Sequence, residues 1–125
     1  MEQFPADSEL LSLFECEPTL SDSGVPWAYN CLHFDTTRGL NRVVCEIEPG
    51  NEIVRLRWVS NGVELVQLDL NWVRGLAVET SHGAEVLIGY FRDPAVRPLR
   101  LQLRPSVHLQ WGTVVEAPSS AKRAV

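Results

Sequence analysis

Three side chains that could share one chemical task alternate along a short stretch of this sequence: Cys31, His33 and Asp35. If the stretch is a β-strand, all three point to the same face of its sheet. A thiol, an imidazole and a carboxylate together suit either a metal site or an activated cysteine nucleophile. Glu46, on the strand expected next, falls opposite Cys31 and would add a second carboxylate.

Spacing argues against both kinds of site. Residues two apart on a strand lie roughly 6.6 Å apart at the backbone, and zinc normally takes three or four converging ligands. His82 falls in an expected turn and His108 on an outward strand position, so neither supplies a further ligand. We therefore assign no catalytic residue, metal or cofactor. A metal-dependent or thiol enzyme built on Cys31, His33 and Asp35 is the least favoured interpretation.

Other enzyme motifs are absent from the sequence: it has no nucleophile-elbow serine, glycine-rich phosphate loop, HExxH or zinc-type cysteine pair. Its three cysteines, an odd number without CxxC spacing, fit a reducing compartment. The first residues, MEQFPADSE, are acidic where a signal peptide is basic and then apolar. No apolar run reaches the roughly 20 residues that span a bilayer. The sequence predicts a non-enzymatic, cytoplasmic protein without a membrane partner.

The elements that would position these side chains are most clearly indicated by IVRLRWVSNGVELVQLDL, residues 53–70. Its two arms alternate apolar and polar residues, which is typical of half-buried strands. A two-residue Asn-Gly turn would place Leu56 opposite Gln67 and so put polar groups on the core face. A three-residue loop, Ser60-Asn61-Gly62, pairs Leu56 with Val66 instead. The register favours this three-residue loop.

Further strands are expected on both sides of this hairpin. Residues 27–35 and 42–48 form one hairpin across a four-residue loop at 37–40. A tight connection at residues 49–52 then keeps Ile47 opposite Val54. Residues 76–80 and 84–90 form another across a Ser-His-Gly loop of odd length, which turns Leu76 and Val78 toward Val86, Ile88 and Tyr90. Residues 99–104 and 107–111 alternate on either side of Pro105, as one bent strand or as a final hairpin.

The ends of the chain read differently. Residues 7–14 favour a short helix, with an N-terminal strand over residues 11–17 as the alternative. Residues 116–125 have no periodicity and are predicted to form a flexible tail. The fold class is therefore mainly β: a single domain over residues 1–115, with seven or eight short strands in an antiparallel meander. The meander would form a sandwich or a partly open barrel.

Charge is unevenly distributed along the chain. Residues 1–52 hold ten acids and two arginines, a balance of −8, whereas residues 53–125 balance at +3, which gives −5 overall. Acidic and arginine-rich strands could pair across the sheet, or the acids could offer a surface to a basic partner. Arg55, Arg57, Arg100, Gln102 and Arg104 could form a basic strip. The overall acidity and the single lysine nevertheless argue against nucleic acid.

Aromatic residues lie close to the acids in the first half of the chain. Trp58 and Trp111 have inward parity and are expected in the core, whereas Trp27 and Trp72 are better candidates for exposure and partner contact. The candidate partner-binding residues are Glu15, Glu17, Asp22, Trp27, Tyr29, Asp35, Glu46 and Glu48.

The leading interpretation is a protein-binding module, of an inhibitor or immunity type, that covers a basic protein surface. It rests on small size, acidity and missing motifs. The alternative is a small-ligand-binding barrel or sandwich with a cavity lined by Trp27, Tyr29 or Trp72. Homo-oligomerisation through an edge strand is a further expectation.

Overall fold

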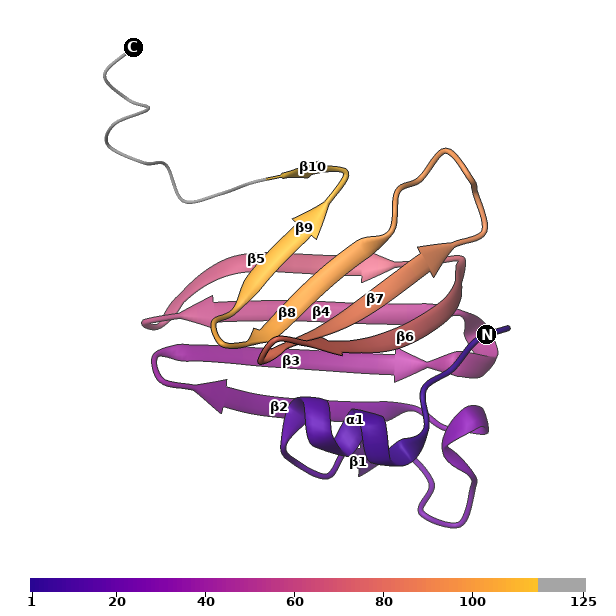
Figure 1. The fold of residues 1–125 in the computed structure, drawn as a ribbon. Helices are drawn as coiled ribbons and strands as arrows, with labels where there is room; N and C mark the ends of the chain where they lie inside the picture. The colour runs from indigo at the N-terminus through magenta and orange to yellow at the C-terminus, as the bar shows by residue number, and fades with distance from the viewer. Residues whose placement is uncertain (115–125) are drawn as a thin grey trace, which may run out of the picture.

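The chain forms two antiparallel β-sheets packed face to face, with one short helix beside them (Figure 1). This computed structural model describes residues 1–114. Neighbouring strands follow one another in the chain, in the orders β1-β2-β3-β4-β5 and β10-β9-β8-β7-β6. The predicted mainly β antiparallel meander is confirmed, and of the two predicted forms the structure has the sandwich. The strands are β1 (Thr19–Leu20), β2 (Leu32–Arg38), β3 (Asn41–Glu48), β4 (Ile53–Ser60), β5 (Val63–Leu70), β6 (Val73–Ser81), β7 (Ala84–Phe91), β8 (Leu99–Arg104), β9 (His108–Trp111) and β10 (Thr113–Val114).

The β4–β5 hairpin closes through a two-residue turn, so the predicted three-residue loop is wrong. Ser60 pairs with Val63. Asn61 and Gly62 between them have φ of 50° and 77°, the left-handed values of a type I′ turn. The Asn-Gly pair therefore adopts the turn that its residue types favour, despite the parity argument against it.

Beyond this turn, a β-bulge returns the apolar residues of both strands to the same face, as predicted. The register shifts at Trp58, which pairs with Val66, and Leu65 is left without a direct partner. One extra residue on one strand reverses the parity from that point on. Leu56 consequently faces Leu68 on the buried side. Apolar residues thus meet apolar residues as predicted, although each pair lies two positions from its expected place.

The β6–β7 hairpin also has a two-residue turn, at His82 and Gly83 with φ of 52° and 79°. The expected odd-length loop is therefore wrong, and so is the pairing of Leu76 and Val78 with Val86, Ile88 and Tyr90, although Val86 and Ile88 are buried. Leu76 instead lies opposite Gly89. The error has a physical cause, because β7 is apolar on both faces and its alternation does not distinguish them. Its core-facing side chains are Leu87 and Phe91.

The first hairpin is tighter than expected. Arg38 pairs with Asn41, so a two-residue turn replaces the predicted four-residue loop. Residues 27–31 lie outside the strand: Trp27–Tyr29 form a short 3₁₀ turn, η1, and β2 begins at Leu32. A second 3₁₀ turn, η2 (Pro49–Asn51), joins β3 to β4. Ile47 lies opposite Val54 across it, as predicted.

Helix α1 (Asp7–Phe14) confirms the helical interpretation of this segment, and it contacts β2, β6 and β7. Leu10, Leu13 and Phe14 are fully buried, and Phe14 stacks on Phe34 with ring centroids 4.2 Å apart. An eight-residue helix is marginal alone in water, and each such buried side chain contributes roughly 1.5–3 kcal/mol. Packing of its buried side chains against both sheets therefore stabilises the helix.

Two arginines from different sheets hold the end of α1. Arg38 donates to the Leu13 carbonyl at 2.9 Å, and Arg104 donates to the Ser12 carbonyl at 2.6 Å. Glu15, the left-handed residue that ends the helix, forms ion pairs with both. These contacts satisfy carbonyls that a helix end leaves without partners.

Pro105 lies in the turn between the antiparallel strands β8 and β9, so this segment is a final hairpin and not one bent strand. The predicted tail over residues 116–125 lies outside the described residues. Within residues 1–114, no helix is long and apolar enough to cross a membrane.

Candidate functional site

Cys31, His33 and Asp35 are not assembled into a reactive group. Cys31 precedes β2, and its thiol donates to Glu46 at 3.9 Å. Burial raises the Cys31 pKa, and the neighbouring carboxylates Glu48 and Glu46 raise it further. This environment favours the unreactive thiol over the thiolate. The Asp35 carboxylate is occupied by Arg42.

Arginines on neighbouring strands neutralise several of the predicted partner-binding acids. Arg42 donates to Asp35 at 2.9 and 2.6 Å, and these bonds lower the pKa of Asp35. Glu48 accepts from Arg55 at 2.5 Å, which lowers the pKa of Glu48. The structure thus has the cross-strand pairing that was the first of the two explanations given for the uneven charge. Such partly exposed pairs contribute about 0–1 kcal/mol each.

The remaining acids on the candidate surface are in different settings. Glu46 lies opposite Arg55 and accepts from the Cys31 thiol rather than from the arginine. Glu17 and Asp22 are exposed, and neither forms an ion pair within residues 1–114. Glu15 ends α1 and forms ion pairs with Arg38 and Arg104. The structure therefore does not gather the predicted acids into one cluster.

A buried asparagine organises the loop at residues 21–26, which carries Asp22. The Asn30 side chain is 5% exposed. Its oxygen accepts from the Ser21 hydroxyl at 2.8 Å and from the backbone N–H groups of Asp22 and Cys31 at 3.2 and 2.9 Å. Its nitrogen donates to the carbonyls of Asp22 and Val25 at 2.5 and 3.0 Å. Asn30 thereby fixes the loop that carries Asp22 and leads into η1.

Two large aromatic side chains stand out from the surface at one end of the sandwich. Tyr29 is 79% exposed and Trp72 is 69% exposed. Tyr29 belongs to η1, which contacts η2. Trp72 lies in the link between β5 and β6, where the next residue, Val73, donates to the carbonyl of Glu52 just after η2. We call this end of the sandwich the aromatic end; it comprises residues 1–3, 21–30, 49–52, 71–74 and 91–93 (Figure 1).

The tryptophans occupy different environments. Trp27 is half-buried with its ring edge-on to Phe34 at 6.2 Å, so it supports η1 rather than standing free. Trp58 and Trp111 are also half-buried, where full burial was expected. Each uses its indole N–H near the surface, Trp58 to the Asn41 side chain at 3.0 Å and Trp111 to a backbone carbonyl at 3.1 Å. Trp72 is the most exposed of the four.

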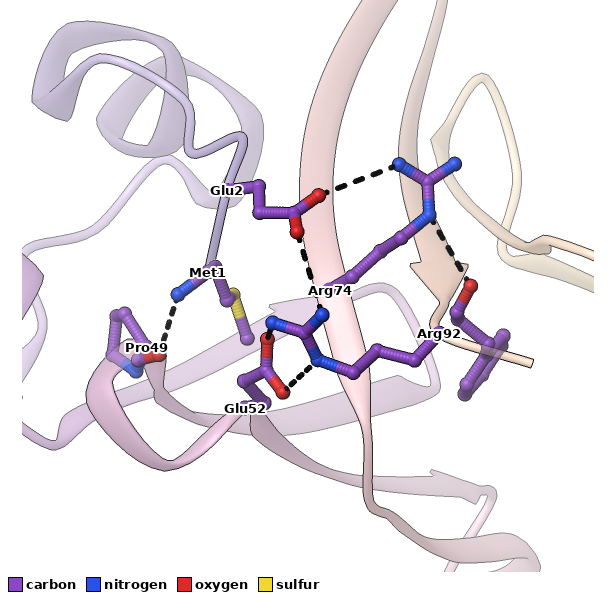
Figure 2. Close-up of polar contacts among 7 residues, drawn as sticks. Met1, Glu2, Pro49, Glu52, Arg74 and Arg92 are labelled. Carbon is purple, nitrogen blue, oxygen red and sulfur yellow. Dashed lines mark hydrogen bonds and ion pairs between the residues drawn. The ribbon is translucent and has the colours of Figure 1, made fainter. Parts of the chain in front are cut away.

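Ion pairs connect the segments of the aromatic end (Figure 2). Arg92 donates two hydrogen bonds to Glu52, at 2.5 and 2.6 Å, and lies 3.4 Å from Glu2. These bonds lower the pKa of Glu52. Arg74 lies 4.0 Å from Glu2 and packs over the Tyr90 ring. Arg92 is 40 positions from Glu52 and 90 positions from Glu2 in the sequence. No local pattern in the sequence therefore indicated this network.

The cavity found between the sheets within residues 1–114 offers little room for a small ligand. A cavity between the sheets, lined by apolar side chains including Cys45, Leu56 and Leu101, has a volume of about 10 Å³. That is the space of one water molecule at most, whereas ligand pockets span roughly 300–1,000 Å³. None of the three aromatics expected to line such a cavity contributes to this one.

Comparisons with known proteins show a similarity of fold but not of sequence. No protein family and no curated protein sequence matches the chain. A solved structure described as a contact-dependent growth inhibition toxin–immunity protein complex from Klebsiella pneumoniae 342 contains a chain with a similar fold. The TM-score is 0.73 with 13% sequence identity, and the match covers 89% of this chain and 96% of the other. At that identity the likeness shows a shared fold.

Proposed function

We propose that this chain is a non-enzymatic protein-binding protein of the immunity type, which acts in the cytoplasm by covering a basic surface of a toxin. The observation that carries the proposal is the similarity of nearly the whole fold to a chain of a toxin–immunity complex. Since both chains are matched almost from end to end, the likeness concerns the complete domain rather than one recurring motif.

The candidate site supports the inhibitor role over an enzymatic one. The thiol of Cys31 has a raised pKa, and Asp35 is held by Arg42. By contrast, Tyr29 and Trp72 expose large aromatic surfaces at the aromatic end, and such side chains commonly dominate the energy of protein interfaces. The acid Asp22 lies in the loop that leads to Tyr29 and adds negative charge, which speeds association with a basic surface.

Co-expression tests this function in cells. Each of the two genes that flank the gene for this chain would be expressed in a bacterial host, with and without the chain. One flanking product is expected to arrest growth alone, and the chain is expected to restore growth. A variant with a disrupted core, Leu101→Asp, should fail to restore it because Leu101 is 1% exposed. Absence of any growth-arresting product, or arrest that persists with the chain present, would contradict the proposal.

A further inference from the structure

The backbone at Trp72 has an unfavourable conformation for a tryptophan. Its φ is +60°, in the left-handed region that bulky residues rarely adopt. The other non-glycine residues with positive φ within residues 1–114 end helical turns or form two-residue hairpin turns: Glu15, Glu52, Asn61 and His82. Trp72 instead lies in the link between the sheets, where glycine or asparagine would be less strained.

Hydrogen bonds hold this strained link on both sides. The carbonyl of Trp72 accepts from the backbone N–H of Arg92 at 2.9 Å, and the following N–H, of Val73, donates to the carbonyl of Glu52 at 3.0 Å. The Arg92–Glu52 side-chain bonds connect the same two neighbours. The backbone is thus fixed while the indole remains 69% exposed. Backbone strain of this kind concentrates at functional sites.

We propose that Trp72 is the anchor of the partner interface, and that its indole inserts into an apolar pocket on the toxin. This inference rests on the proposed function and assigns the contact to one residue. A rigidly presented aromatic side chain loses little conformational freedom on binding and buries a large area. Tyr29, in η1 at the same end, provides a second exposed ring.

Charge around Trp72 indicates the chemistry of the partner. The aromatic end carries four carboxylates, Glu2, Asp22, Glu52 and Asp93, against the two guanidinium groups of Arg74 and Arg92. The N-terminal ammonium of Met1, which donates to the Pro49 carbonyl, lies in the same region, so the net charge of the aromatic end is −1. Both arginines are engaged within the network, whereas Asp22 and Asp93 form no ion pair within the described part of the chain. The pocket on the toxin is consequently rimmed by lysine or arginine.

Calorimetric titration with the purified growth-arresting product of the flanking gene tests this anchor. Trp72→Ala and Trp72→Gly are expected to weaken binding about 30-fold or more, as loss of an interface hot spot does. Leu40→Ala is the matched control because Leu40 is 71% exposed at the opposite end, in the β2–β3 turn, and its affinity should be unchanged. Wild-type affinity in both Trp72 variants, with a wild-type chain that binds, would overturn the anchor and leave the proposed function standing.

Thermal unfolding of the same variants tests the strain without the partner. Both variants remove the indole, but glycine adopts positive φ freely whereas alanine does not. Trp72→Gly is therefore expected to unfold at a higher temperature than Trp72→Ala. An equal or lower midpoint for Trp72→Gly would contradict a strained backbone at this position. Failure of the wild-type chain to bind the toxin would overturn both proposals together.

Discussion

The buried side-chain amide of Asn30 forms five hydrogen bonds, which fix the loop at residues 21–26. Asn30→Ala would leave the carbonyls of Asp22 and Val25 without this donor. We expect it to lower the free energy of unfolding by about 2–4 kcal/mol, because unpaired buried polar groups are costly. Urea denaturation measures the change. Asn71→Ala, at an exposed asparagine of the same end, should cost about 0.5 kcal/mol or less, and similar losses in both variants would contradict this role.

The Arg92–Glu52 pair makes part of the stability pH-dependent. Arg92 lowers the pKa of Glu52 in the folded protein, so the stabilisation is complete above the ordinary glutamate pKa of about 4.3 and is lost as pH falls through the lowered folded value. Arg92→Met should therefore be less stable than wild type at pH 7, with the gap narrowing in acid. Urea denaturation at pH 7 and pH 3 measures the gap. A constant gap would contradict the assignment, and Arg97→Met, at an exposed arginine, serves as the control.

For single residues, the sequence indicated which aromatic side chains are exposed but few of the contacts between side chains. It singled out Tyr29 and noted Trp72 as a candidate for exposure, and both are exposed. It gave no sign that Glu52 and Arg92 meet, because 40 residues and two different sheets separate them. It also placed Asn30 in a strand, whereas the side chain organises a loop. Side-chain amide networks depend on the final path of the chain rather than on periodicity.

At the scale of elements, the β4–β5 hairpin gives a direct contrast between its two faces. Leu56 is 3% exposed and lies in the core, whereas Arg57 is exposed and pairs with Glu64 at 2.6 Å. Leu56→Ala should lower the free energy of unfolding by about 2–5 kcal/mol. Arg57→Ala should cost about 0.5–1 kcal/mol or less. Chemical denaturation distinguishes the two, and equal losses would show that the faces are assigned wrongly.

Strand existence was predictable in this protein, and exact register was not. Alternation along residues 53–70 indicated which side chains face inward, because burial of one face sets a period of two. The bulge at Leu65 changes register without changing that alternation along most of the strand. In β7 the alternation itself was uninformative, because both faces of the strand carry buried apolar residues. Val86 and Ile88 are buried although they lie outside the main core cluster. Turn chemistry at Asn61-Gly62 and His82-Gly83 was the better guide to the loops.

At the scale of the whole molecule, the uneven charge has two consequences. Much of it is neutralised where acidic strands adjoin arginine-bearing strands, as in Asp35–Arg42 and Glu48–Arg55. The β1–β5 face therefore presents paired charges. The aromatic end retains a net negative charge beside Tyr29 and Trp72. Composition predicted the excess of acids but not their distribution, which depends on how the two sheets meet. Edge-strand oligomerisation stays a prediction, with Val63 and Leu65 exposed on the edge strand β5.

Binding of the purified chain to the growth-arresting product of the flanking gene can be followed by surface plasmon resonance at low and high salt. We expect a one-to-one complex with a dissociation constant of about 10⁻⁷ M or lower. The association rate should fall at least about 10-fold from low to high salt, because charge steers the encounter, while the dissociation rate changes much less. No complex at micromolar concentrations, or an association rate independent of salt, would contradict the proposed function.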